Sequence, residues 1–198
     1  MTPKAILILG AGPNAGLHIT KYFSEKSHKT VAVARNLSAD INKIVDLVIK
    51  SDFSNPSNIK AILDEVKEKV GIPNVVVYNA YANPMAATGD PFTIPLDDFI
   101  AGLNTNMVSP YAAMSEAITG VKRLPREILK TFIYTGNLCM QLVMPVAMNL
   151  SLGERVLDLY YELATMKDQG IWGGTFVKEQ GYVDFEGRIG SLPNIGDA

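Results

Sequence analysis

The sequence predicts an α/β protein with a doubly wound parallel sheet in three α/β/α layers, truncated at its C-terminal side. Three observations predict this class. The chain has short continuous apolar runs, apolar residues recur at helical spacing after the early runs, and a glycine-rich turn directly follows the first run. Continuous apolar runs are typical of parallel strands that helices cover on both faces. Three repeats of a strand followed by a helix favour right-handed crossovers within one sheet.

The elements can be placed in chain order. Strands are expected at 5–9, 30–34, 46–50, 74–78 and 131–134. Helices are expected at 17–23, 59–70 and 96–120, where apolar residues recur at helical spacing. Ser54, Asn55 and Pro56 offer cap chemistry ahead of the second helix, and three prolines and a glycine predict a loop over 83–95.

The last third of the chain has a weaker pattern. Leu138 to Leu152 is apolar, but Pro145 argues against one uninterrupted helix there. Helical periodicity returns from Glu154 to Lys167, and Thr175 to Val177 predicts a short strand. The length and composition favour a single domain over residues 1–198.

Composition excludes several classes of function. The chain has 198 residues, 47% of them hydrophobic, and a formal net charge of -2, which gives no electrostatic footprint for nucleic acid. One cysteine and two histidines exclude a disulfide framework and a zinc ligand cluster, so no metal is expected. No apolar run approaches the ~20 residues that cross a bilayer, and no signal-peptide pattern is present. We therefore expect a cytoplasmic protein without a membrane span.

The glycine turn behind the first strand is the clearest candidate site. Gly10, Gly12 and Gly16 leave the approach to the backbone free of Cβ atoms. Backbone amides in such a turn, and at the N-terminus of the next helix, point toward a bound pyrophosphate. The position between a strand and a helix favours nucleotide binding, with a purely structural tight turn as the alternative.

This turn resembles the Gly-x-x-x-Gly-x-Gly motif of the short-chain dehydrogenase/reductase family, with Asn14 in place of the second glycine. Asparagine tolerates left-handed backbone angles, so we expect the turn to survive with a looser fit to the phosphates. Further matches to the family follow in order at Asp52, Asn79 and Asn106, and the resemblance covers roughly residues 5 to 137. It implies a Rossmann-like fold that binds a nicotinamide dinucleotide.

The resemblance assigns roles to these matches. Asp52 takes the place of the aspartate that meets the adenine amino group, and Tyr78-Asn79-Ala80-Tyr81 resembles the family's Asn-Asn-Ala-Gly. Asn106 takes the place of the family's mid-helix asparagine. Ordinary alternatives stay open: Asp52 as a turn residue, Asn79 as a turn former at a strand end, and Asn106 as an exposed helix residue.

The end of the second strand indicates the choice of cofactor. It reads Ala34-Arg35-Asn36, without the acidic residue that would accept hydrogen bonds from both ribose hydroxyls of NAD. An arginine in this position can pair with a 2′-phosphate, so the sequence favours NADP over NAD. An ordinary surface charge at Arg35 is the alternative.

The catalytic residues of the family are largely missing. Its members use a serine on the fifth strand and a Tyr-x-x-x-Lys pair on the next helix. Here Thr135 offers a hydroxyl and Gly136 is nearer the serine's place, but the sequence has no tyrosine between Tyr134 and Tyr160. It has no lysine between residues 130 and 167 either. An internal deletion would explain the short chain and the missing pair together.

The sequence therefore predicts an NADP-dependent oxidoreductase of a carbonyl or alcohol with a degraded catalytic site, and a non-catalytic dinucleotide sensor or interaction protein is the alternative. The small-molecule substrate is undetermined, and homodimers are common in the family. Thr135 and Asn106 are the candidate groups for orienting substrate. The candidate cofactor contacts are Gly10, Gly12, Asn14, Gly16, Leu17, Arg35, Asp52, Asn79 and Ala80.

Overall fold

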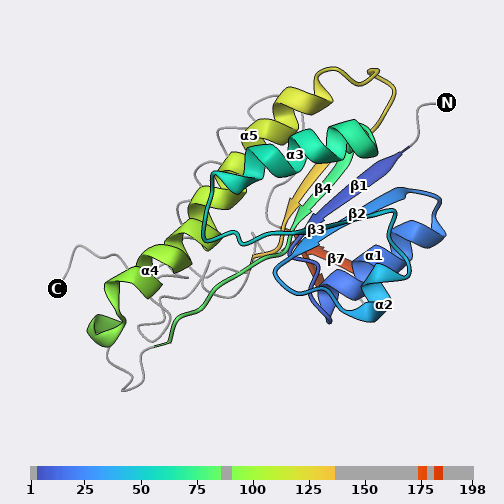
Figure 1. Ribbon diagram of the computed structural model, residues 1–198. Coiled ribbons are helices and arrows are strands. Elements are labelled where there is room, and N and C mark those ends of the chain that lie inside the picture. Colours follow the sequence, from blue (N-terminus) through green and yellow to red (C-terminus); the bar gives the residue numbers. More distant parts are fainter. Residues whose placement is uncertain (1–3, 86–90, 137–173, 178–180, 185–198) are drawn as a thin grey trace. The chain divides into compact units, whose positions relative to one another are not determined.

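The fold is taken from a computed structural model, which describes residues 4–85, 91–136, 174–177 and 181–184 (Figure 1). Contacts between Cα atoms divide the chain into two compact units, Met1–Asp158 and Leu159–Ala198. The expected segments 138–152 and 154–167 lie outside the described residues.

A five-stranded parallel sheet forms the centre of the first unit. Its strands are β1 (Ala5–Leu9), β2 (Lys29–Ala34), β3 (Leu47–Lys50), β4 (Val75–Tyr78) and β5 (Thr131–Tyr134). They lie in the order β3-β2-β1-β4-β5, and every adjacent pair is parallel. This order places the switch in winding direction between β1 and β4, as in a Rossmann-like fold. The predicted fold class is confirmed.

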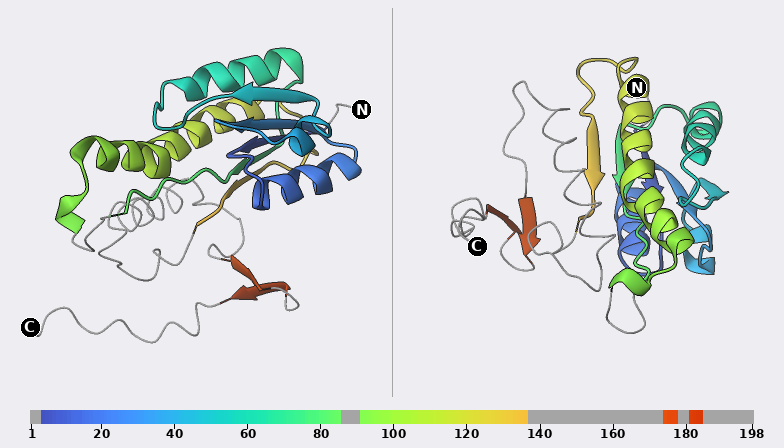
Figure 2. Two further views of the ribbon diagram at one scale, coloured as in Figure 1. Left: turned by 60° about the horizontal axis from the view of Figure 1, so that its bottom comes forward. Right: turned by 90° about the vertical axis from the view of Figure 1, so that its left-hand side faces the viewer.

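Helices cover both faces of this sheet. Those that lie over the sheet are α1 (Ala15–Glu25), α2 (Ala39–Asn42), α3 (Asn58–Lys69) and α5 (Ser109–Val121). The helix α4 (Leu96–Leu103) extends beyond the sheet (Figure 1). A short 3-10 helix, η1 (Pro91–Thr93), precedes α4, and a π-helical turn, η2 (Asn104–Val108), joins α4 to α5. Figures 1 and 2 show α3 and α5 over one face, with α1 and α2 over the other.

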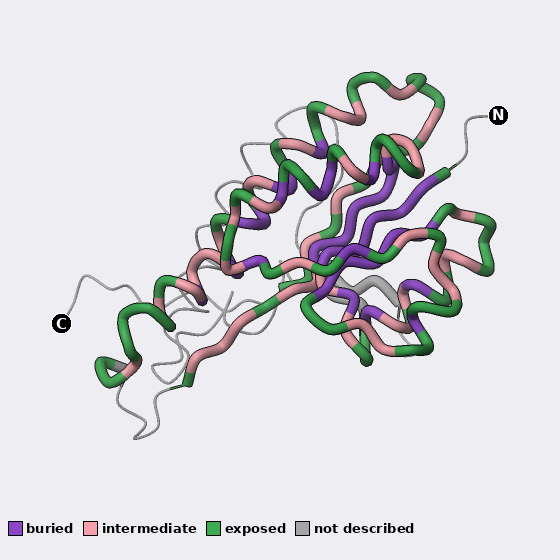
Figure 3. The backbone as a smooth tube through the Cα atoms, in the orientation of Figure 1, coloured by how far each residue is buried: buried purple, intermediate pink, exposed green. Residues whose placement is uncertain are grey.

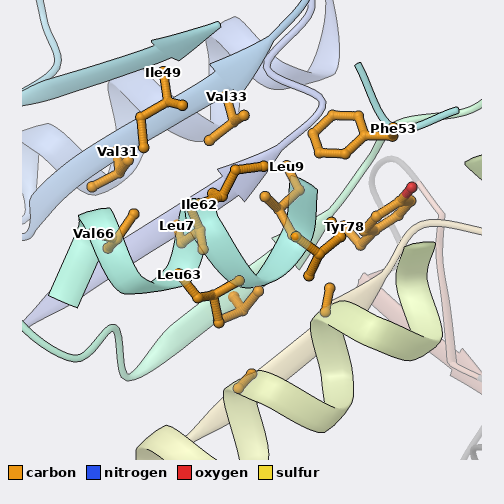
Figure 4. Close-up of a cluster of buried hydrophobic side chains, with 14 residues drawn as sticks. Leu7, Leu9, Val31, Val33, Ile49, Phe53, Ile62, Leu63, Val66 and Tyr78 are labelled. Atoms are coloured by element: carbon orange, nitrogen blue, oxygen red, sulfur yellow. The ribbon is translucent and has the colours of Figure 1, made fainter. Parts of the chain in front are cut away.

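Alternate residues of β1, β2 and β4 belong to two separate hydrophobic clusters. On β1, Leu7 and Leu9 pack toward α3 and α5, whereas Ile6 and Ile8 pack toward α1 and α2. The central strands are buried along their length (Figure 3), and Figure 4 shows the side chains of α3 meeting those of the sheet. This double burial explains why the strands read as continuous apolar runs.

The structure refines the predicted helices in two places. The expected helix at 96–120 is present, but the π-helical turn η2 interrupts its hydrogen-bond pattern. The short helix α2 was not predicted. Its four residues begin where the Ser38 hydroxyl accepts a hydrogen bond from the Ile41 N–H, and Ile41 is its one buried residue. One buried residue leaves no periodicity for a sequence pattern to detect.

In the second unit the structure describes an antiparallel hairpin of β6 (Gly174–Val177) and β7 (Gly181–Asp184), with Phe176 opposite Tyr182. The strand expected at 175–177 is therefore confirmed, and β7 was missed. None of the helices in the described part of the chain combines the length and the apolar character that a bilayer crossing requires.

Candidate functional site

The glycine turn connects β1 to α1 at the carboxyl end of the sheet. Gly10 has a φ of 96°, and a Cβ atom there would overlap the backbone of Ala80. A Cβ atom on Gly16 would meet the Cα of Ala11 at 2.6 Å. Glycine is therefore required at both positions by close backbone packing.

Gly12 differs, because a Cβ atom there would meet nothing within 4 Å. The turn is open on this side. Within the described residues, no acceptor bonds the backbone N–H groups of Asn14, Ala15 and Gly16, which form the first turn of α1. Three unpaired N–H groups at the positive end of a helix, next to an open glycine, suit a bound phosphate group.

The structure corrects one expectation about Asn14. Its φ is -94°, so this position does not use the left-handed conformation for which asparagine was expected to be tolerated. Its side chain makes no capping bond to α1.

Leu17 is held by contacts within the protein. Its N–H donates to the Gly12 carbonyl at 2.9 Å, and its side chain packs against the cluster beneath α1.

Asn79, directly after β4, links three strand ends. Its Nδ2 donates to the Gly10 carbonyl at 2.9 Å, and its Oδ1 lies 3.0 Å from the Thr135 hydroxyl. The backbone N–H groups of Asn79 and Ala80 both donate to the Leu9 carbonyl. Asn79 therefore ties the glycine turn to the candidate catalytic residue.

Thr135 follows β5 and is exposed. Its hydroxyl lies 3.1 Å from the Tyr78 carbonyl and 3.0 Å from the Asn79 carboxamide oxygen, and it can donate its one proton to only one of them. The oxygen lone pairs remain able to accept a hydrogen bond from a ligand. The structure thus brings Thr135, Asn79 and Gly10 together at one edge of the sheet.

Asn106 is fully buried, so the alternative of an exposed helix residue is wrong. Its Oδ1 accepts from the Ala82 N–H at 2.9 Å, and its Nδ2 donates to the Ala82 carbonyl at 2.7 Å. With both ends of its carboxamide engaged, Asn106 holds the chain that leaves β4. In this geometry it is a positioning residue rather than a group that faces a substrate.

The π-helical turn around Asn106 is followed by Pro110, which has no N–H. In a π pattern the Thr105 carbonyl would accept from residue 110, and in an α pattern the Asn106 carbonyl would. Pro110 therefore leaves one of these two carbonyls without its helical donor. Two tyrosines donate to them from the sheet: the Tyr78 hydroxyl to the Thr105 carbonyl at 2.6 Å, and the Tyr134 hydroxyl to the Asn106 carbonyl at 3.4 Å. Burial raises the pKa of Tyr78, so it stays a neutral donor.

The role of these tyrosines was missed from the sequence. The available signal was Pro110 inside an expected helix, because an interior proline leaves a carbonyl that needs a donor from outside the helix. The tyrosine rings stack at 6.1 Å between centroids. Tyr78 and Tyr134 end neighbouring strands and are register partners, which brings both hydroxyls to the same turn.

Arg35 and Asp52 follow β2 and β3 and line one open groove of ≈ 550 Å³. Arg35 is exposed, and within the described residues no ion pair joins it to a carboxylate. One Asp52 oxygen accepts from the Ser54 N–H at 2.9 Å, so Asp52 does act as a turn residue. Its other oxygen has no bond within the described residues, which leaves an acceptor free in the groove.

Metal ligands and a tyrosine–lysine pair are two further kinds of catalytic group that such a site could contain. Within the described residues, no cluster of histidine, cysteine and carboxylate side chains could hold a metal ion. A Tyr-x-x-x-Lys spacing does occur at Tyr22 and Lys26, where the ammonium lies 5.7 Å from the ring centroid. This pair is at the C-terminal end of α1, whereas the phosphate-facing amides are at its N-terminal end. It is therefore not a catalytic pair for the site.

The order of the strands and the glycine turn after the first of them define a protein of the Rossmann-like class. No family model matches the chain. A short chain dehydrogenase/reductase of Cryptosporiopsis sp. is 30% identical over 237 residues, covering 93% of this chain and 96% of the relative. The chain belongs to the short-chain dehydrogenase/reductase family. The aligned region exceeds 198 residues, so the relative contains residues without counterparts here.

Solved structures show the same fold. A 4-hydroxyisoleucine dehydrogenase complexed with NADH has a TM-score of 0.71 at 20% identity, covering 82% of this chain and 68% of that chain. A 3-oxoacyl-[acyl-carrier protein] reductase from Brucella melitensis has a TM-score of 0.73 at 14% identity, covering 83% and 69%. A variant of an actinorhodin polyketide ketoreductase with NADPH has a TM-score of 0.70 at 16% identity, covering 82% and 64%.

Proposed function

We propose that this oxidoreductase-family protein binds NADP at the glycine turn, and that its nominal reaction is hydride transfer between NADP and a carbonyl or alcohol. The amides of Asn14, Ala15 and Gly16 hold the pyrophosphate, and Gly12 leaves room for its approach. The dinucleotide, when bound, supplies or accepts the hydride. Thr135 orients the substrate oxygen through its exposed hydroxyl, which accepts a hydrogen bond from an alcohol, or turns its one proton from Tyr78 or Asn79 to a substrate carbonyl.

Arg35 is the observation that carries the choice of NADP. It is exposed at the carboxyl end of β2, without an ion-pair partner within the described residues. Arg35 and Asn36 stand directly after β2, where an acidic residue would bind the ribose hydroxyls of NAD. A guanidinium binds a phosphate group through two parallel hydrogen bonds. Arg35 therefore favours the cofactor with a 2′-phosphate.

Titration of the purified chain with NADPH and NADH tests this assignment. We expect tighter binding of NADPH, and Arg35→Ala should weaken NADPH about tenfold or more while leaving NADH unchanged. Arg126→Ala is the matched control, because Arg126 is also exposed but lies before β5, at the opposite edge of the sheet. Equal or tighter binding of NADH by the unmodified chain would contradict the proposal.

The second part of the proposal is that the acid–base machinery is degraded. The family's tyrosine–lysine pair has no counterpart in the segment between residues 135 and 166, and the alignment with the relative leaves residues of that protein unmatched. Without a general acid, proton transfer to the substrate oxygen loses about 10²- to 10⁴-fold in rate. We therefore expect slow or no turnover.

A screen of aldehydes and ketones with NADPH, followed by absorbance, measures this turnover. The expected result is oxidation of NADPH at the background rate for each substrate. Robust turnover that Thr135→Ala abolishes would instead show that the site is catalytically competent.

A sensor or interaction protein is the second candidate function. It is favoured because the sequence keeps the glycine turn but lacks the family's tyrosine–lysine pair between residues 135 and 166. The Asn79 bridge couples Gly10 to Thr135, so dinucleotide binding at the turn can be transmitted to the neighbouring strand end. Tight NADPH binding without any turnover would favour the sensor, whereas measurable turnover would favour the enzyme.

A further inference from the structure

A groove of ≈ 360 Å³ lies between α3 and α5, away from the glycine turn. One face of α3, the last part of α5, and the connection from α3 to β4 line it. The strands of the sheet are all parallel, so both helices run back toward its amino edge and are parallel to each other (Figure 1). A groove of this volume suits a small molecule.

The lining of the groove is apolar between the two helices. Leu63 and Ala117 belong to the buried cluster, and Ile72 and Pro73 line the groove beside them. Gly120 lines it from α5, although glycine inside a helix is less favourable than alanine. The nearest atom to a Cβ on Gly120 would be Ile72 Cγ2 at 3.5 Å, an ordinary contact. Packing therefore does not require glycine here, and its effect is to leave the groove open.

The two carboxylates of the groove both lie close to Lys60. The Lys60 ammonium donates to Asp64 Oδ2 at 2.6 Å. This hydrogen bond, together with the nearby charge of Glu116, raises the pKa of Lys60. Glu116 is on α5 and Lys60 is on α3, so their proximity fixes one level at which the two walls of the groove face each other.

Two cations, Lys67 and Arg123, lie at the other end of the groove. Lys67 follows Lys60 by seven residues, and Arg123 follows Glu116 by the same number, which is two helical turns or about 10 Å. Arg123 is just beyond α5, but its N–H donates to the Gly120 carbonyl at 3.0 Å, so the chain continues to turn. The parallel helices therefore bring both cations to the same level. Neither has an ion-pair partner within the described residues.

This arrangement defines the chemistry of a ligand. A lysine and an arginine that lack partners, on opposite walls, suit one anionic head group. The end of α5 offers no competing acceptors, because the carbonyls of Ile118, Gly120 and Val121 all accept backbone N–H groups. The apolar lining between the two charged levels suits a hydrocarbon tail.

We propose that the groove between α3 and α5 is a second ligand site, which binds a small carboxylate with an apolar tail. The carboxylate lies between Lys67 and Arg123, and the tail lies along Leu63, Ile72 and Ala117. The site is separate from the glycine turn and does not depend on the proposed function, because the turn lies at the carboxyl edge of the sheet.

Calorimetric titration of the full chain with octanoate, octylamine and acetate tests the site. We expect octanoate to bind with a dissociation constant of about 1 mM or below, and at least about tenfold more tightly than the other two probes. Octylamine has the same tail with the opposite charge, and acetate has the same head group without the tail. Saturating NADPH should leave the affinity for octanoate unchanged.

Variants of the groove locate the bound octanoate. Lys67→Gln and Arg123→Gln should each weaken it about fivefold, and Gly120→Leu should abolish binding by filling the groove. Lys69→Gln and Arg126→Gln are the matched controls, because both residues are exposed nearby but do not line the groove. They should change the affinity less than about twofold.

Several results would overturn the inference. They are no saturable binding of octanoate, equal binding of octylamine or acetate, competition with NADPH, or affinities that the groove variants change no more than the controls do. NADPH affinity should be the same in all of these variants. A failure of the unmodified chain to bind NADPH would refute the proposed function and would leave the expected octanoate results unchanged.

Discussion

Strands β4 and β5 are neighbours of equal length, yet their environments differ. All four residues of β4 are buried, whereas β5 alternates between exposed and half-buried residues. Val77 and Ile133 are register partners on the same face of the sheet, and they are 2% and 41% exposed. A parallel strand is normally covered on both faces. The described helices therefore bury β4 on both faces, whereas they leave residues of β5, the strand before Thr135, exposed.

This difference concerns the two parts of the proposed site. The glycine turn lies beside β1 and β4, where two clusters of buried side chains hold the backbone in place. Thr135 lies at the end of β5. Its hydrogen bonds go to Tyr78, the last residue of β4, and to Asn79, which follows it. A well-supported turn and a sparsely covered strand end agree with a protein that binds a dinucleotide better than it uses one.

The largest expected effect is at the junction of β1 and β4. Gly10→Ala should destabilise the fold by at least about 3 kcal/mol, because the new Cβ would overlap Ala80 and the φ of 96° disfavours alanine. Gly12→Ala should change stability by less than about 0.5 kcal/mol, because its Cβ enters open space. Urea denaturation measures both. Similar losses in the two variants would mean that the turn does not divide into a packed and an open side.

The next effect compares the two strands directly. Val77→Ala should cost about 2 to 3 kcal/mol of unfolding free energy, because it opens a cavity among buried side chains. Ile133→Ala removes more carbon atoms but should cost under about 1.5 kcal/mol, because Ile133 is already partly in water. Thermal and urea unfolding provide the measurement. A larger loss for Ile133→Ala would show that β5 is covered in solution.

The smallest effect compares the tyrosines that end these strands. Tyr78→Phe should cost about 1 to 2 kcal/mol, because it leaves the Thr105 carbonyl without its donor at 2.6 Å. Tyr134→Phe should cost less, because its bond to the Asn106 carbonyl is 3.4 Å long. Urea denaturation measures the unfolding free energy that each variant loses. Equal losses would contradict the expectation that Tyr78 of β4 stabilises the π-helical turn more than Tyr134 of β5.

Tyr78 also predicts a pH dependence. Burial raises its pKa above the ordinary value of 10.0, so the folded chain keeps the phenol proton at pH values where the unfolded chain loses it. The contribution to stability is full below pH 10.0 and declines as the pH rises above it. The stability advantage of the unmodified chain over Tyr78→Phe should therefore shrink between about pH 9.5 and 11. An advantage that grows with pH would contradict the assignment.

The sequence by itself determined the sheet and the glycine turn behind its first strand. Strands with both faces buried are apolar throughout, so β1, β2 and β4 could be read directly, and a glycine turn between a strand and a helix has few other uses. The sequence also placed Asp52, Asn79 and Asn106 in the family's order. It predicted a helix over 96–120 without the π-helical turn inside it, because periodicity averages over such a local change.

Only the tertiary structure decided what the polar residues do. The burial of Asn106 and its clamp on Ala82 join residues 24 apart in sequence, and the link from Asn79 to Thr135 spans 56. Such contacts depend on which strands lie side by side, and no local pattern contains that order. The same holds for Tyr78 and Tyr134, whose hydroxyls donate to the Thr105 and Asn106 carbonyls because β4 and β5 are neighbours in the sheet.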